Sequence, residues 1–152
     1  MSSFSDTFSN QDREGFAKRN LKIGSVIKVF VSDTKPPKEK RLVLVGISYD
    51  QIYYASIFLN SEINANLFNT TALKDLHIEL KAVDRVYLDH DSFADCSQIQ
   101  KRKAEWLLEL ISDDPSKVLG ELNEYDLKLL QAKIKSAPTI TPALKKTFGL
   151  FL

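Results

Sequence analysis

The sequence has one cysteine, few glycines and almost no net charge, and each of these shortages excludes a class of protein. A single cysteine, Cys96, cannot form an internal disulfide and fits a reducing compartment. The five glycines form no Gly-x-Gly pattern, so the chain has no glycine-rich phosphate loop. A formal net charge of +1 argues against a protein that coats nucleic acid nonspecifically. Any contact with nucleic acid must therefore come from a local basic patch.

Long apolar runs are missing as well. None approaches the roughly 20 residues that a helix needs to span a bilayer, and the N-terminus lacks the charged and apolar regions of a secretion signal. We therefore expect a cytoplasmic protein with no membrane partner. An apolar fraction of 43% in 152 residues is enough for a real core, in one domain or in one small domain with a helical tail.

A basic segment with two adjacent prolines, 35–41, lies between two apolar runs, 26–31 and 42–47. Both runs are rich in β-branched residues and short enough to be strands. The prolines cannot donate backbone hydrogen bonds, so we expect them to interrupt strand pairing and to hold the segment as a semi-rigid exposed loop. The four cations and one anion of this loop predict that it binds anionic partners such as RNA phosphates.

Further strands are expected at 51–59, 77–80 and 85–88, and the first of these forms a hairpin with 42–48 across a short turn. Five or six short strands in series, with no helices between them, favour an antiparallel barrel or a strongly bent sheet. Residues 1–20 are a polar N-terminal arm, which is either loose or a short helix laid on the domain formed by 21–152.

The last third of the chain shows helical patterns. Residues 104–111 place an apolar stripe on one helix face, and the basic run before them, 101–103, reads as the solvated start of that helix. Asn123 is an expected N-cap of a second helix, whose buried stripe is Leu127, Leu130 and Ile134. Thr141 is the expected cap of a short third helix that Gly149 closes. Strands first and helices last indicate an α+β fold.

The polar segment 89–96 contains residue types that bind zinc, but its spacing does not suit a metal site. In an extended segment alternate side chains point to opposite faces, so His90 faces away from Asp89 and Asp91. The segment is better explained as a strand with polar ends beside a turn. A cysteine needs a base to become a nucleophilic thiolate at neutral pH, and the sequence around Cys96 matches no family of catalytic cysteines, so Cys96 reads as a small buried residue.

Four short segments follow the pattern of one family. An opening strand that begins with glycine lies at 24–29, and a second strand that begins with arginine after a basic loop lies at 41–48. A strand that ends at a hydroxyl residue lies at 57–61, and Gly-x-Leu before a capped helix lies at 119–127. Together they resemble the MazF/PemK-like toxins, small ribosome-independent endoribonucleases built on a bent SH3-like barrel.

The resemblance implies an α+β fold, with an SH3-like antiparallel β-barrel and C-terminal helices. It also implies a toxin of a toxin–antitoxin system, which cuts single-stranded RNA in a sequence-dependent way without a metal or other cofactor, forms a homodimer and binds an antitoxin protein. Four aromatic residues that a small barrel cannot all bury lend indirect support to the dimer: Tyr53, Tyr54, Phe58 and Phe68.

RNA cleavage through the 2′-hydroxyl needs a base, an acid and positive charge on the phosphorane. Arg41 is the expected source of that charge, because a guanidinium pairs bidentately with phosphate oxygens and keeps its proton. Ser61 and Asn60 are expected to orient the phosphate or ribose. The flanking phosphates are assigned to Lys35, Lys38 and Lys40. Two alternatives stay open: a non-catalytic RNA- or protein-binding module on the same barrel, and a degenerate toxin with a structural role.

Overall fold

The computed structural model describes residues 10–32 and 38–151 and combines strands with helices. The strands are β1 (Ser25–Val31), β2 (Lys38–Ile47), β3 (Tyr53–Asn60), β4 (His77–Leu80), β5 (Ser92–Asp95), β6 (Gln100–Lys103) and β7 (Val118–Glu121). The helices are α1 (Asn10–Asn20), α2 (Thr71–Lys74), α3 (Ala104–Asp113), α4 (Glu124–Ser136) and α5 (Pro142–Thr147), with a 3₁₀ turn, η2 (Pro115–Lys117), between α3 and β7.

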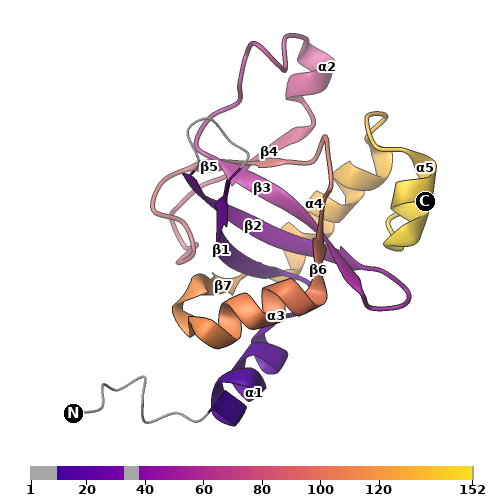
Figure 1. Ribbon diagram of the computed structural model, residues 1–152. Helices are drawn as coiled ribbons and strands as arrows, with labels where there is room; N and C mark the ends of the chain where they lie inside the picture. The colour runs from indigo at the N-terminus through magenta and orange to yellow at the C-terminus, as the bar shows by residue number, and fades with distance from the viewer. Residues whose placement is uncertain (1–9, 33–37, 152) are drawn as a thin grey trace.

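All the described strands belong to one curled sheet in the order β4-β5-β3-β2-β1-β7 (Figure 1). Strand β6 pairs with β3 beyond the point where β5 stops, so β5 and β6 share one edge of β3. Each of these pairings is antiparallel. The expected α+β class and strongly bent antiparallel sheet are therefore confirmed.

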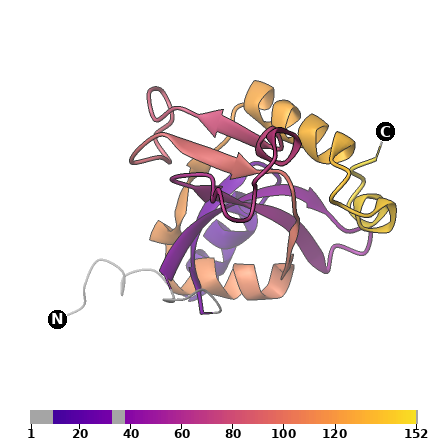
Figure 2. The same cartoon turned by 90° about the horizontal axis from the view of Figure 1, so that it is seen from above.

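The sheet has a core on each of its faces. Along β2, Val43 and Val45 belong to one core together with Leu130 and Ile134 of α4. Leu42 and Leu44 alternate with them and belong to a second core, which includes Leu107 and Ile111 of α3. Figure 2 shows α4 and α5 on one side of the sheet and α3 on the other. Burial of both faces explains why this strand is an uninterrupted apolar run rather than an alternating one.

Local capping explains where the late helices begin. The side chain of Asn123 accepts a hydrogen bond from the backbone N–H of Asp126, and the side chain of Thr141 accepts one from that of Leu144. Gly149 follows α5 with a φ of +68°, a left-handed conformation that glycine adopts without strain. Both predicted caps and the predicted closing glycine are confirmed.

Helix α1 forms part of the fold. Its Ala17 is fully buried in the core that contains Leu107 and Ile111 of α3. Of the two alternatives for the N-terminal arm, the short helix laid on the domain is therefore correct for residues 10–20. None of the helices in the described parts of the chain is long and apolar enough to cross a membrane.

Four sequence predictions of secondary structure need correction. The segment 85–88 is a series of turns, and the second strand starts at Lys38, so that the basic residues 38–41 lie in β2 rather than in a loop. The basic run 101–103 is part of strand β6. The strands do not form a series without helices, because α1 precedes β1, α2 lies between β3 and β4, and α3 lies between β6 and β7. Pairing with β1 and with β3 makes strands of 38–41 and 101–103 despite their weak local propensity, whereas 85–88 pairs with none of the described strands. The two prolines, 36 and 37, lie outside the described residues.

Candidate functional site

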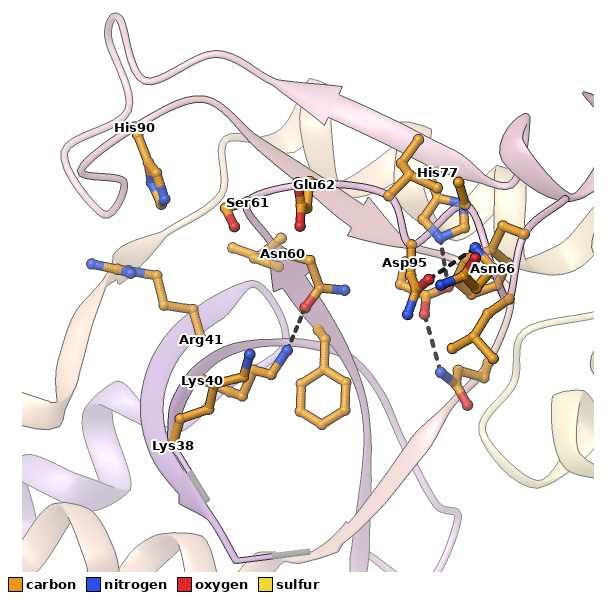
Figure 3. A pocket seen from close by; sticks show the side chains of 18 of the residues that line it. Lys38, Lys40, Arg41, Asn60, Ser61, Glu62, Asn66, His77, His90 and Asp95 are labelled. Carbon is orange, nitrogen blue, oxygen red and sulfur yellow. Dashed lines mark hydrogen bonds and ion pairs between the residues drawn. The ribbon is translucent and has the colours of Figure 1, made fainter. Parts of the chain in front are cut away.

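A pocket of about 1020 Å³ lies where β2 begins and β3 ends (Figure 3). Its walls come from β2, β3, β4, β5 and the segment that follows β3, in which all the residues from Ser61 to Phe68 line the pocket. The curl of the sheet brings these strand ends around a common space.

Strand alternation determines which side chains share a face inside this pocket. Lys40 points to the same face of β2 as Leu42 and Leu44, because alternate residues of a strand share a face. On the neighbouring strand β3, Asn60 points to the same face as Phe58. Beyond β3, Asp95 of β5 pairs directly with His77 of β4, on the face opposite to that of Ala94 and Ile78. One continuous face therefore carries a lysine, an amide and a His–Asp pair. Lys40 and Asp95 are 55 positions apart in the sequence, and the sheet brings them onto this common face.

Lys40 is held at a fixed place on this face. Its Nζ donates a hydrogen bond of 2.8 Å to Oδ1 of Asn60 and lies 5.3 Å from the centre of the Phe58 ring. Burial lowers the pKa of the Lys40 ammonium, and the charge of Lys38 lowers it further, while Asp95 opposes these effects. Among the described residues no carboxylate lies within ion-pair distance of Lys40. Its charge is therefore available to an anionic ligand.

Arg41 points to the opposite side of β2 and is already engaged. Its Nε donates to the backbone carbonyl of Tyr87 at 3.1 Å, and its Nη2 donates to Oδ2 of Asp89 at 2.6 Å. The Arg41 side chain is only 21% exposed, whereas that of Asp89 is 83% exposed. The arginine is thus rigidly placed, but its partner carboxylate can return to water at little cost.

The His77–Asp95 pair forms the inner end of the pocket (Figure 3). Both side chains are almost fully buried, at 1% and 3% exposed. His77 Nδ1 lies 3.2 Å from the backbone carbonyl of Leu73, and Phe68 meets the ring edge-on at a centroid distance of 4.3 Å. His77 Nε2 is 3.5 Å from Oδ1 of Asp95, yet it makes no hydrogen bond.

The Asp95 carboxylate is saturated by donors from its own segment. Its Oδ1 accepts from the backbone N–H of Ser97 at 3.0 Å and from the Ser97 hydroxyl, and its Oδ2 accepts from Nε2 of Gln98 at 3.1 Å. These bonds hold a buried negative charge beside the imidazole.

The structure brings most of the sequence-predicted site residues to this one pocket. They are Arg41, Asn60, Ser61, Lys38 and Lys40; Lys35 lies outside the described residues. The sequence reading missed His77, Asp95 and Gln98 as pocket residues. His77 and Asp95 each lie at the end of a short strand, but they come together only through the β4–β5 register.

Two further sequence expectations concern Cys96 and metal binding. Cys96 is fully buried, and burial raises the pKa of its thiol to about 12, so it is a packed core residue and not a nucleophile at neutral pH. Within residues 10–32 and 38–151, no three His, Cys, Asp or Glu side chains come close enough together to hold a metal ion.

Comparison with protein-family models, curated proteins and solved structures gives no match for this chain.

Proposed function

We propose that this protein is a metal-independent endoribonuclease that cuts single-stranded RNA at the pocket between β2, β3 and β5. One observation carries the proposal: two lysines and an arginine from 38–41 and an amide and a hydroxyl from 60–61 line a single pocket of about 1020 Å³. These groups are the donors that bind phosphate and ribose oxygens. A pocket of this size accommodates more than one nucleotide unit of a flexible strand.

The contacts suggest a division of roles between the two cations. Lys40 is fixed by Asn60 and has no described acidic partner, so we assign the scissile phosphate to its ammonium. Arg41 points to the other side of the strand and takes the neighbouring phosphate. Ser61 orients the ribose or phosphate from the rim, and Lys38 holds a flanking phosphate, with Lys35 continuing the track.

Electrostatics at the rim favour an anionic ligand. The acid between the cations of β2, Glu39, is paired with Lys28 at 2.9 Å and with Lys117 at 3.4 Å. Hydrogen bonds from these two lysines, that from Lys28 first, lower the pKa of the Glu39 carboxyl. Its negative charge is therefore compensated locally and opposes RNA binding only weakly.

The proposed chemistry is tested with wild-type protein and single-stranded RNA in EDTA. We expect cleavage to leave a 2′,3′-cyclic phosphate and a 5′-hydroxyl, because the 2′-oxygen displaces the 5′-oxygen without a metal. RNA binding at low salt without cleavage would support the non-catalytic RNA-binding module instead. If the protein neither cuts nor binds RNA, both proposals fail and a protein partner becomes the better explanation.

Replacing Asp89 by asparagine should strengthen RNA binding. The change removes the exposed carboxylate that occupies Arg41 and leaves the Tyr87 carbonyl to position the guanidinium. Arg41→Ala should act in the opposite direction, weakening binding and reducing the steepness of its salt dependence. Fluorescence anisotropy with labelled RNA over a range of salt concentrations measures both.

The control for this prediction is Glu14→Gln, which removes the same charge from helix α1 at a residue that does not line the pocket. If Glu14→Gln raises RNA affinity as much as Asp89→Asn does, the effect reflects net charge alone. In that case Asp89 does not compete with RNA for Arg41.

We further propose that the curled sheet is an SH3-like barrel of the MazF/PemK kind, in a cytoplasmic toxin that forms a homodimer and binds an antitoxin. The aromatic residues offered in support of a dimer are largely inside the fold, since Tyr54 is buried and Tyr53, Phe58 and Phe68 are half-buried. Other large side chains are exposed and could serve an interface instead: Phe30, Tyr49, Tyr125 and Phe151.

The dimer is tested by light scattering at micromolar concentration. We expect a mass of twice the 17.2 kDa chain. A mass of 17.2 kDa that is independent of concentration would reject the dimer.

A further inference from the structure

The proposed reaction requires a group that removes the proton of the 2′-hydroxyl, and neither Lys40 nor Arg41 can do this as a cation. We propose that His77 is this base and that Asp95 stabilises the imidazolium that forms. The inference rests on the proposed function and adds a catalytic residue that the sequence did not indicate.

The hydrogen bond at Nδ1 determines which nitrogen of His77 is basic. The Leu73 carbonyl, 3.2 Å from Nδ1, can only accept a hydrogen bond, and Nε2 makes none, so we assign the proton of the neutral ring to Nδ1. The lone pair is then on Nε2. This nitrogen is buried and has no hydrogen-bond partner, although the side chain lines the pocket. An unpaired buried acceptor of this kind is unfavourable unless a ligand satisfies it.

The Asp95 carboxylate lies beside the nitrogen that takes the proton in the proposed step. Its Oδ1 lies 3.5 Å from His77 Nε2, close enough for attraction to an imidazolium. Because Ser97 and Gln98 donate to the Asp95 carboxylate, it stays in place before and after proton transfer. A fixed negative charge close to the ring stabilises the imidazolium once it has formed.

His77 and Lys40 also face the same space. Both lie on one face of the sheet, and the charge of Asp95 acts on the Lys40 ammonium. Figure 3 shows Lys40 reaching toward Asn60 in the middle of the pocket, with His77 and Asp95 on one side of it and Arg41 on the other. In this view the Lys40 ammonium, where we place the scissile phosphate, lies between the proposed base and the arginine.

The complete step is balanced without an external reagent other than water. His77 Nε2 takes the proton of the ribose 2′-hydroxyl while the 2′-oxygen forms a bond to phosphorus. The bond between phosphorus and the 5′-oxygen of the next nucleotide breaks, and that oxygen takes a proton from water at the open mouth of the pocket. The hydroxide left from that water takes the proton from His77 Nε2, which restores the neutral base. RNA gains access to Nε2 by displacing Phe68, which packs against the ring.

The test compares His77→Gln with His90→Gln, a histidine at the exposed end of the same pocket to which we assign no role. We expect His77→Gln to lower kcat by about 10²-fold to 10⁴-fold. Its RNA affinity should change little, and the acid limb of the pH–rate profile should disappear. His90→Gln should keep the wild-type rate and profile. Thermal melting checks that each variant is folded.

A second measurement uses the wild-type protein and does not depend on activity. The ¹⁵N resonances of His77 should show the neutral ring protonated on Nδ1. If His77→Gln fails to fold, this measurement decides, and a proton on Nε2 of the neutral ring overturns the proposal.

The outcomes separate the two proposals. If the wild type cuts RNA and folded His77→Gln cuts it at the same rate with the same pH profile, His77 is not the base and the proposed function stands. If the wild type cuts no RNA, the proposed function and this inference both fail.

Discussion

Lys40→Ala should lower the rate of RNA cleavage by about 10²-fold to 10³-fold, the typical cost of removing one preorganised donor from a transition state. The ammonium is held by Asn60 at 2.8 Å and, among the described residues, is not neutralised by an acid. Its field therefore acts on the negative charge that develops on the phosphorane. Single-turnover cleavage of a labelled RNA measures the effect, and circular dichroism verifies that the variant is folded.

Lys38→Ala is the matched control, since it removes the same charge two positions away on the same face of β2. Lys38 is exposed, so its loss should weaken binding moderately and leave the rate for bound RNA unchanged. Equal rate losses in the two variants would contradict a special role for Lys40 and indicate a general electrostatic contribution.

The pH dependence gives an additional check on Lys40. Because its pKa is lowered from the usual 10.5, the charge on this lysine disappears at a lower pH than that on an exposed lysine. Cleavage should accordingly decline on the alkaline side before pH 10.5 is reached. This decline should be absent from the residual activity of Lys40→Ala.

Of the substitutions proposed here, Arg85→Ala should lower the stability of the fold most, by about 3 kcal/mol in the free energy of unfolding. Arg85 forms a bidentate pair with Asp126, with Nε 2.9 Å from Oδ2 and Nη2 3.0 Å from Oδ1. Asp126 is only 2% exposed, so the substitution leaves a buried carboxylate without its cation. We place the loss at the lower end of the usual range because the Arg85 side chain is 24% exposed and water can enter.

Thermal denaturation should register this loss as a fall in Tm of roughly 6–12 °C for a domain of this size. The control is Lys128→Ala, which breaks the exposed pair with Glu124 on the same helix and should leave Tm unchanged. A similar Tm for Arg85→Ala and Lys128→Ala would show that the Arg85–Asp126 pair contributes no net stability.

The Arg85–Asp126 pair also bears on the candidate site. Arg85 lies in the segment between β4 and β5 that supplies the Tyr87 carbonyl and the Asp89 carboxylate to Arg41. Anchoring this segment to α4 therefore fixes the environment of Arg41. The importance of 85–88 arises from these contacts and not from the strand that its sequence suggested.

The sequence determined the features of this protein that depend on neighbouring residues. Asn123 and Thr141 fix the starts of α4 and α5 because a cap acts on N–H groups three residues away. The stripe with Leu130 and Ile134 identifies the buried face of α4, since helical periodicity is a local property. The apolar runs of β1, β2 and β3 were likewise sufficient to predict a bent antiparallel sheet.

Only the tertiary structure decided which residues share the pocket. Strand register places His77 beside Asp95 and, through β3, aligns them with Lys40, and no local pattern carries that information. The same is true of β6 and β7, whose polar or glycine-containing sequences become strands because β3 and β1 offer unpaired edges. Residue types and caps are set along the chain, whereas the proximity of distant side chains depends on the pairing and curl of the sheet.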